Sequence, residues 1–267
     1  MRDLVKLEWP SEAVALVTLT DFVPQHNLTC KGVSQLADAM EEARKEGARV
    51  TVLASGVPGH WFEHAYLDDI SNLVGGRPAT GDPSGWFRSL EEVSRKSVVT
   101  IAAITGDTSG GGCELGWGCD LRVAEKGARF SQPEVIIGVG TGIGGTCRLM
   151  RLIGRTATAE MVLTGQPVLA ERIYELGGIN RLVGKGEAVR VALEMASQMA
   201  KLPPMALAGM KRMLTEDEDL HLTQALANDQ TISQTLFADP TAISNMDKIQ
   251  KRLNKGETLA GIYWKRD

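Results

Sequence analysis

The residues best suited to chemistry lie in one short segment, SGGGCELGWGCDL, which runs from Ser109 to Leu121. Its three consecutive glycines have no Cβ, so the backbone there can come close to a bound molecule. The residues after them suit the first turns of a helix, whose free N–H groups would point into the same space. N–H donors beside the carboxylate of Glu114 could stabilise negative charge on an activated carbonyl. The segment alone fits equally well a tight strand-to-helix turn with an exposed glutamate.

A second carboxylate, Glu134, stands in the segment SQPEVIIG, Ser131 to Gly138. It follows a proline-ordered turn, and the glycine-rich, uncharged stretch 139–146 behind it could line a closely fitted pocket. Two carboxylates in a partly apolar site tend to have separated pKa values. One could then activate a water while the other, protonated, delivers a proton. Spacing alone also permits Glu134 to be an edge carboxylate in a salt bridge.

Apolar runs predict the elements that must position these residues. Periodicity predicts strands over 14–19, 50–54 and 97–104, with helices over 33–45 and 86–96 between them. The front of the chain therefore has a βαβ character, and its third strand leads into the glycines. Residues 75–83 form a loop by their glycine and proline content.

The back of the chain is helical from Glu187 onward and is punctuated by Pro203, Pro204 and Pro240. We expect an α/β core over residues 1–200 and a C-terminal helical region over 201–267. Within that region, the acidic run 216–219 is interpreted as the solvated start of a helix.

Composition narrows the class of function. The chain has 267 residues, 43% hydrophobic and 23% charged, with a net charge of −4. Basic residues are spread along the sequence, which argues against nucleic acid or an anionic membrane as a partner. Charged residues interrupt the N-terminus, so no secretory signal is expected, and no apolar run reaches the length of a membrane span. The four cysteines lack metal-type spacing and read as free thiols of a cytoplasmic protein.

Taken together, these residues resemble the crotonase, or enoyl-CoA hydratase/isomerase, superfamily. The matching segments agree with it in order and spacing: GGGCEL at 110–115, CDL at 119–121, FSQPE at 130–134, GGTCRL at 144–149 and LTG at 163–165. The likeness continues more weakly over the whole chain, including residues 26–28, 203–214 and 248–253.

The resemblance implies a spiral of ββα units with a C-terminal helical region used for oligomerisation, in a homotrimer or a dimer of trimers (a homohexamer). It also implies an acyl-CoA thioester substrate from fatty acid metabolism. No separate cofactor is expected, since CoA arrives as part of the substrate. The family polarises the thioester carbonyl with two backbone N–H groups, which here are those of Gly111 and Ala65. Its two catalytic carboxylates would be Glu114 and Glu134, which hold the added water. The Glu134 equivalent transfers the proton at the α-carbon.

The segment WFEHAYL, residues 61–67, departs from the family pattern. The family has a glycine where this chain has His64 and an aspartate where it has Tyr66. The expected substrate-binding residues are Glu63, Ala65, Tyr66, Leu67 and Gly111. His64 is either an extra acid/base group that redirects the chemistry or a packed or surface residue. His60 and His64 could share a metal on one helix face, but a turn is predicted there and no third ligand has motif spacing. No metal is therefore expected.

The leading hypothesis is hydration of a 2-enoyl-CoA through a thioester enolate. The alternative is a crotonase-fold isomerase, hydrolase or retro-aldol lyase that acts on a specialised acyl-CoA and uses His64. A third hypothesis, a catalytically weak binding or assembly protein, is disfavoured because both glutamates and the glycine triplet are present.

Overall fold

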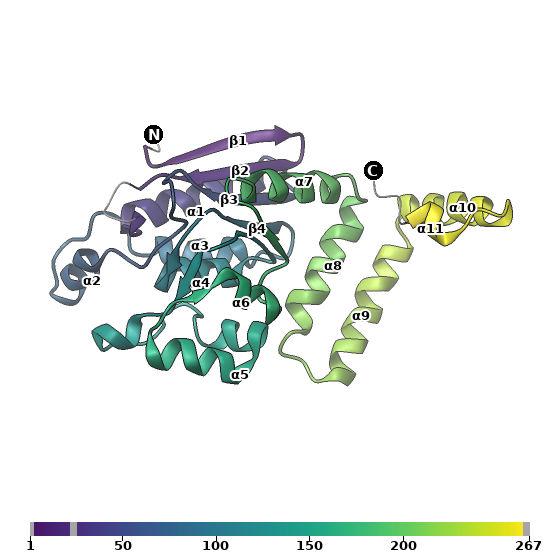
Figure 1. The fold of residues 1–267 in the computed structure, drawn as a ribbon. Helices are drawn as coiled ribbons and strands as arrows, with labels where there is room; N and C mark the ends of the chain where they lie inside the picture. The colour runs from purple at the N-terminus through teal and green to yellow at the C-terminus, as the bar shows by residue number, and fades with distance from the viewer. Residues whose placement is uncertain (1–2, 22–25, 264–267) are drawn as a thin grey trace. The chain divides into compact units, whose positions relative to one another are not determined.

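The computed structural model describes residues 3–21 and 26–263, and the chain divides after Ala200 into two compact units. The first unit contains a mixed main sheet with the order β1-β2-β3-β4-β6-β9, of which Figure 1 labels the first four strands. Its strands are β1 (Val5–Ser11), β2 (Val14–Leu19), β3 (Val50–Ser55), β4 (Val99–Ile104), β6 (Leu121–Glu125) and β9 (Arg181–Val183). β1 pairs antiparallel with β2, and every later neighbour is parallel.

The central strands are apolar because both faces of this sheet are covered. Every residue of β4 is buried, as expected for a parallel strand covered on both sides. Helix α7 (Ala188–Ala200) contacts β2, β3, β4 and β6 and buries an alanine at every fourth position, a spacing that keeps one face of a helix against the strands. Helix α1 (Cys30–Lys45) contacts β1 and β2 and packs on α3 (Gly85–Val93).

A second, smaller sheet positions the candidate site. It contains β5 (Thr108–Ser109), β7 (Arg129–Ser131) and β8 (Val168–Leu169). β5 and β7 run parallel with Ser109 opposite Ser131, so the glycine triplet and the segment bearing Glu134 leave the sheet side by side. Helix α4 (Gly110–Gly118) follows β5, and a short 3₁₀ helix, η2 (Glu134–Ile137), follows β7. α2 (Leu67–Val74), α5 (Cys147–Thr164) and α6 (Ala170–Glu175) complete this unit.

The second unit is helical. It contains α8 (Pro204–Asp217), α9 (Leu222–Phe237), α10 (Pro240–Asn254) and α11 (Leu259–Tyr263). α8 contacts α9, where Gly209 leaves room for the Leu236 side chain. Both α8 and α10 start with proline, whose missing N–H has no partner to lose at the first helical position.

The α/β front and the helical back agree with the sequence prediction, while several boundaries differ. α1 starts at Cys30, three residues earlier than predicted, because the Thr29 hydroxyl accepts the N–H of Gly32 and caps the helix. α4 already starts at Gly110, within the glycine triplet. The interpretation of residues 216–219 as a helix start is wrong: Glu216 and Asp217 end α8, where Asn228 donates to both. Among the described residues, no helix is long and apolar enough to cross a membrane.

Candidate active site

The glycine triplet lies directly against the backbone of residues 62–64. The Gly112 N–H donates to the Glu63 carbonyl at 3.0 Å. A Cβ on Gly112 would lie 2.1 Å from the Phe62 oxygen, and one on Gly110 would lie 2.8 Å from the His64 Cβ. Gly110 also has a φ of +48°, which favours glycine. The three glycines are thus explained by close approach to a second backbone segment, and not by a turn alone.

The backbone N–H groups of Ala65 and Gly111 have no acceptor among the residues that the structure describes. Gly111 is the second residue of α4, where N–H groups lack a partner in the preceding turn. Ala65 lies between His64, whose carbonyl accepts from the Leu28 N–H, and Tyr66, whose N–H donates to the Leu28 carbonyl. Across the described residues, neither the Ala65 N–H nor the Gly111 N–H donates to a protein oxygen. Both remain available to a ligand oxygen.

Glu114 is buried and held by the glycine-rich stretch that follows Glu134. Its Oε1 accepts the N–H of Ile143 at 2.9 Å and that of Gly145 at 2.6 Å. Residues of the 139–146 stretch thus hold the Glu114 carboxylate, while the expectation that the stretch lines a closely fitted pocket stays a prediction. At the C-terminal end of α4, the buried Arg122 donates to the carbonyls of Gly116 and Cys119, which fixes the helix that carries Glu114.

The carboxylate of Glu134 also lies beside the glycine triplet, close to Gly110. Its Oε1 is 3.4 Å from the position that a Cβ on Gly110 would occupy, next to the His64 Cβ. Burial, with a further contribution from the charge of Glu114, raises the pKa of Glu134 from 4.5 to about 7. With the Gln132 amide oriented so that its oxygen faces the Trp117 Nε1 at 3.1 Å, its nitrogen donates to both Glu134 oxygens, at 3.0 and 3.2 Å. Glu134 is therefore a half-buried acid that can hold a proton near neutral pH.

The side chains of the 61–67 segment differ in their contacts and in their exposure. Both carboxylate oxygens of Glu63 contact protein groups, Ser109 and His60. Tyr66 directs its hydroxyl to Asp68, and Leu67 begins α2 with 40% of its surface exposed. His60 and His64 do not share a helix face, since this segment is not helical. The roles of these residues toward a substrate stay predictions.

His64 has a defined tautomer. Its Nδ1 lies 2.8 Å from the Ala65 carbonyl oxygen, which only accepts, so Nδ1 carries the hydrogen. In the neutral ring Nε2 is the nitrogen that bears the lone pair, and no partner for it lies among the described residues.

Sequence reasoning did not assign a role to Gln132, to Ser109 or to Trp86. Gln132 and Ser109 both lie in segments that were recognised, but Gln132 also contacts Trp117 and Ser109 contacts Glu63 and His64, which lie on other segments. Trp86 lies where a Cβ on Gly111 would fall, 2.7 Å from its ring, and so covers one side of the glycines. These contacts depend on strand pairing and helix packing between distant parts of the sequence.

The geometry can be compared with known proteins. The model of the enoyl-CoA hydratase/isomerase family matches residues 10–252. The chain belongs to the enoyl-CoA hydratase/isomerase family. Two curated relatives of this family member span most of its length. The 2,3-dehydroadipyl-CoA hydratase of Escherichia coli (strain K12) is 36% identical over 228 residues, which cover 85% of this chain and 88% of that protein. The probable enoyl-CoA hydratase 2, mitochondrial, of Arabidopsis thaliana is 30% identical over 239 residues, covering 88% and 78%.

Solved structures show the same fold. The enoyl-CoA hydratase from Mycobacterium tuberculosis H37Rv has a TM-score of 0.80 at 27% identity and covers 93% of this chain and 96% of that one. A probable enoyl-CoA hydratase/isomerase from Mycobacterium abscessus has a TM-score of 0.79 at 28% identity, with coverage of 94% and 97%. The predicted crotonase-like architecture is confirmed, and the chain is an enzyme of the enoyl-CoA hydratase/isomerase type.

Proposed function

We propose that this family member hydrates a 2-enoyl-CoA, adding water across the double bond conjugated with the thioester carbonyl. The observation that carries the proposal is Glu134. Its carboxyl group lies beside the glycine triplet and has a pKa of about 7, raised by burial and also by the charge of a second carboxylate, Glu114. Hydration requires both an acceptor and a donor of protons on one side of the substrate.

The free N–H groups of Ala65 and Gly111 would bind the thioester oxygen. When a nucleophile adds to the β-carbon, negative charge moves onto that oxygen and forms an enolate. Donors fixed before the reaction stabilise this charge without reorganisation, and one such donor is worth roughly 10²–10³ in rate.

The two glutamates would divide the proton transfers. Oε1 of Glu114 already accepts two N–H groups, so its Oε2 is the oxygen free to take a proton from water. The hydroxide forms the new C–O bond at the β-carbon, and the double-bond electrons move into the enolate. Protonated Glu134 then donates its hydrogen to the α-carbon as the enolate collapses. The proton left on Glu114 returns to Glu134 through solvent, which completes the addition of one water.

Further parts of the proposal concern cofactors, the oligomeric state and the location of the protein in the cell. We propose that the enzyme needs no metal or redox cofactor, since the oxyanion donors and the two carboxylates supply every group that the addition requires. We also propose a homotrimer or a dimer of trimers, from the resemblance of the C-terminal helices to the family's oligomerisation region. A cytoplasmic location is proposed because the four cysteines are free thiols.

His64 favours one alternative. With the hydrogen on Nδ1, its Nε2 is a base beside the acyl site that hydratases of the family lack. A second candidate function is therefore isomerisation, thioester hydrolysis or retro-aldol cleavage of a specialised acyl-CoA, with His64 as the additional acid/base. His64→Ala separates the two: the hydratase proposal predicts that crotonyl-CoA hydration survives this substitution, and loss of all turnover would favour the alternative.

The direct test follows the loss of ultraviolet absorbance as conjugation disappears. The substrates are crotonyl-CoA, longer and branched 2-enoyl-CoAs, and 2,3-dehydroadipyl-CoA, the compound for which the Escherichia coli relative is named. The proposal predicts loss of absorbance with at least one of them, and a loss at least about 10²-fold slower with Glu134→Gln. Failure with the whole panel would refute it.

A further inference from the structure

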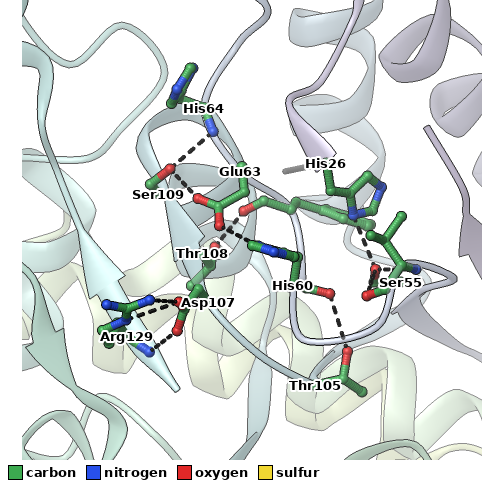
Figure 2. A network of polar contacts seen from close by, with 12 residues as sticks. His26, Ser55, His60, Glu63, His64, Thr105, Asp107, Thr108, Ser109 and Arg129 are labelled. Carbon is green, nitrogen blue, oxygen red and sulfur yellow. Dashed lines mark hydrogen bonds and ion pairs between the residues drawn. The ribbon is translucent and has the colours of Figure 1, made fainter. Parts of the chain in front are cut away.

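The two segments that carry the free N–H groups are joined by side chains as well as by backbone. Ser109 Oγ accepts the N–H of His64 at 3.1 Å and donates its own hydrogen to Glu63 Oε2. The other carboxylate oxygen of Glu63 contacts His60 Nδ1 at 3.0 Å. Figure 2 shows this series of contacts running from His64 through Ser109 and Glu63 to His60.

The positions of these residues give the contacts their importance. Ser109 directly precedes the glycine triplet, and His64 directly precedes Ala65. The hydroxyl of Ser109 therefore connects the segment that carries the Gly111 N–H to the segment that carries the Ala65 N–H. The Ser109 N–H adds a backbone bond to the Phe62 carbonyl at 3.3 Å.

Burial and charge make this junction specific. Ser109 is 7% exposed, and the side chain of Glu63 is 12% exposed. A carboxylate only accepts hydrogen bonds, so it fixes the direction of the serine hydrogen and leaves the hydroxyl lone pairs for the His64 N–H. Hydrogen bonds to a charged acceptor are about twice as strong as neutral ones, and His60 restrains that acceptor from its other side.

The arrangement does not match a nucleophilic serine. In a Ser–His–acid triad the hydroxyl bonds to the imidazole, whereas here it bonds to the carboxylate and the imidazole lies beyond. The hydroxyl thus serves as a connection between two backbones.

We propose that Ser109 and Glu63 are positioning residues of the oxyanion hole, which set the separation of the Ala65 and Gly111 N–H groups, while His60 holds Glu63 in place. The inference rests on the proposed function. It gives Glu63 a role through Ser109, in place of contact with the substrate.

The test combines kinetics with the spectrum of a bound, unreactive ligand. The probe is butyryl-CoA labelled with carbon-13 at the thioester carbonyl, whose infrared stretch moves to lower frequency when the oxygen accepts hydrogen bonds. Ser109→Ala and Glu63→Ala should each lower kcat for enoyl-CoA hydration roughly 10–100-fold, since misplacement of a reacting group by about 1 Å costs up to 10²-fold. Each should also reduce the infrared shift, while the Kd of butyryl-CoA changes by less than about threefold, because CoA contacts are untouched.

Two further variants sharpen the result. Glu63→Gln retains an oxygen that can accept the Ser109 hydrogen, so it should restore both the rate and the infrared shift to near wild type. Glu92→Gln is the matched control. Glu92 lies on α3 and is also buried and bonded to basic groups, namely Arg44 on α1 and Arg95, which follows α3. It should change neither quantity.

Wild-type rates and shifts in both alanine variants would overturn the inference. Ser109→Ala decides the matter if Glu63→Ala does not fold. A wild-type protein that binds butyryl-CoA without any carbonyl shift would instead refute the oxyanion hole itself, and the inference with it.

Discussion

Gly112 provides a sharp test of how the site is assembled. Its φ is compatible with alanine, so substitution adds only a methyl group. That methyl would lie 2.1 Å from the Phe62 oxygen, 2.3 Å from the Phe62 carbonyl carbon and 2.5 Å from the Glu63 oxygen. Ordinary contact begins at 3.4 Å. The two backbone segments must therefore separate by roughly 1 Å, and the Gly112–Glu63 hydrogen bond must lengthen.

This separation moves the Ala65 N–H away from the Gly111 N–H. We expect Gly112→Ala to lower kcat/KM for enoyl-CoA hydration by about 10²-fold, because a reacting group misplaced by about 1 Å costs that much. Overpacking should also cost about 1–3 kcal/mol of the free energy of unfolding. Steady-state kinetics measures the first effect and urea unfolding the second.

The control for this prediction lies in the same helix. A Cβ on Gly116 would approach only the Trp61 ring, at 3.1 and 3.4 Å, and an aromatic ring can tilt where a backbone cannot. Replacing a mid-helix glycine with alanine also gains about 0.5–1 kcal/mol. Gly116→Ala should therefore keep its rate within about threefold of wild type. A Gly112→Ala enzyme as active as Gly116→Ala would refute the proposed assembly.

Three more outcomes are expected. Glu134→Gln should lower kcat roughly 10²–10⁴-fold while acyl-CoA binding, measured by calorimetry, survives; near-wild-type turnover would reject its role. Because Glu134 donates its proton during hydration, the wild-type kcat/KM should decline as the pH rises through about 7, and a flat profile up to pH 9 would contradict this. Glu114→Ala, which leaves the Ile143 and Gly145 N–H groups without an acceptor, should cost about 1–3 kcal/mol in chemical unfolding, whereas Glu114→Gln should fold normally and lose activity; equal stability of the two would count against these contacts.

A fourth outcome concerns stability and pH. Below pH 4.5 Glu134 is protonated in both the folded and the unfolded states and contributes nothing. Between 4.5 and about 7 the folded state keeps a proton that the unfolded state releases, so the wild type loses stability as the pH rises, and above about 7 the loss is complete. Glu134→Gln avoids this loss. It should exceed the wild type by about 1–2 kcal/mol at pH 8, a value reduced for solvent screening because the group is only half-buried. If the free energies of unfolding of Glu134→Gln and the wild type differed by the same amount at pH 5 and at pH 8, the raised pKa of Glu134 would be refuted.

Helices and strands could be predicted where the pattern of apolar residues within one segment is clear by itself. β4 is buried throughout and is apolar except for Thr100, and α1 shows a helical spacing of apolar residues. β1 was missed because exposed charges and Pro10 interrupt the apolar pattern of an antiparallel edge strand. The short strands β5 and β7 are too brief to show a period, yet they bring the two glutamate segments together.

The candidate site could be proposed from the sequence as a set of residues, but its geometry could not. Glu114, Glu134 and the glycines stand out in the sequence, and family resemblance adds Ala65. The contacts of Ser109 with His64 and Glu63 join residues that are far apart in the chain, so only the folded structure reveals them. The raised pKa of Glu134 likewise depends on burial and on the nearby charge of Glu114.

The most direct test of the account is the product formed from crotonyl-CoA in deuterated, oxygen-18-labelled water. Mass spectrometry should find a 3-hydroxyacyl-CoA with heavy oxygen at the β-carbon and deuterium at the α-carbon, formed at least about 10²-fold more slowly by Glu134→Gln. Release of free CoA thiol, a shifted double bond without gain of oxygen, or the same product formed at a near-wild-type rate by Glu134→Gln would contradict the proposed mechanism.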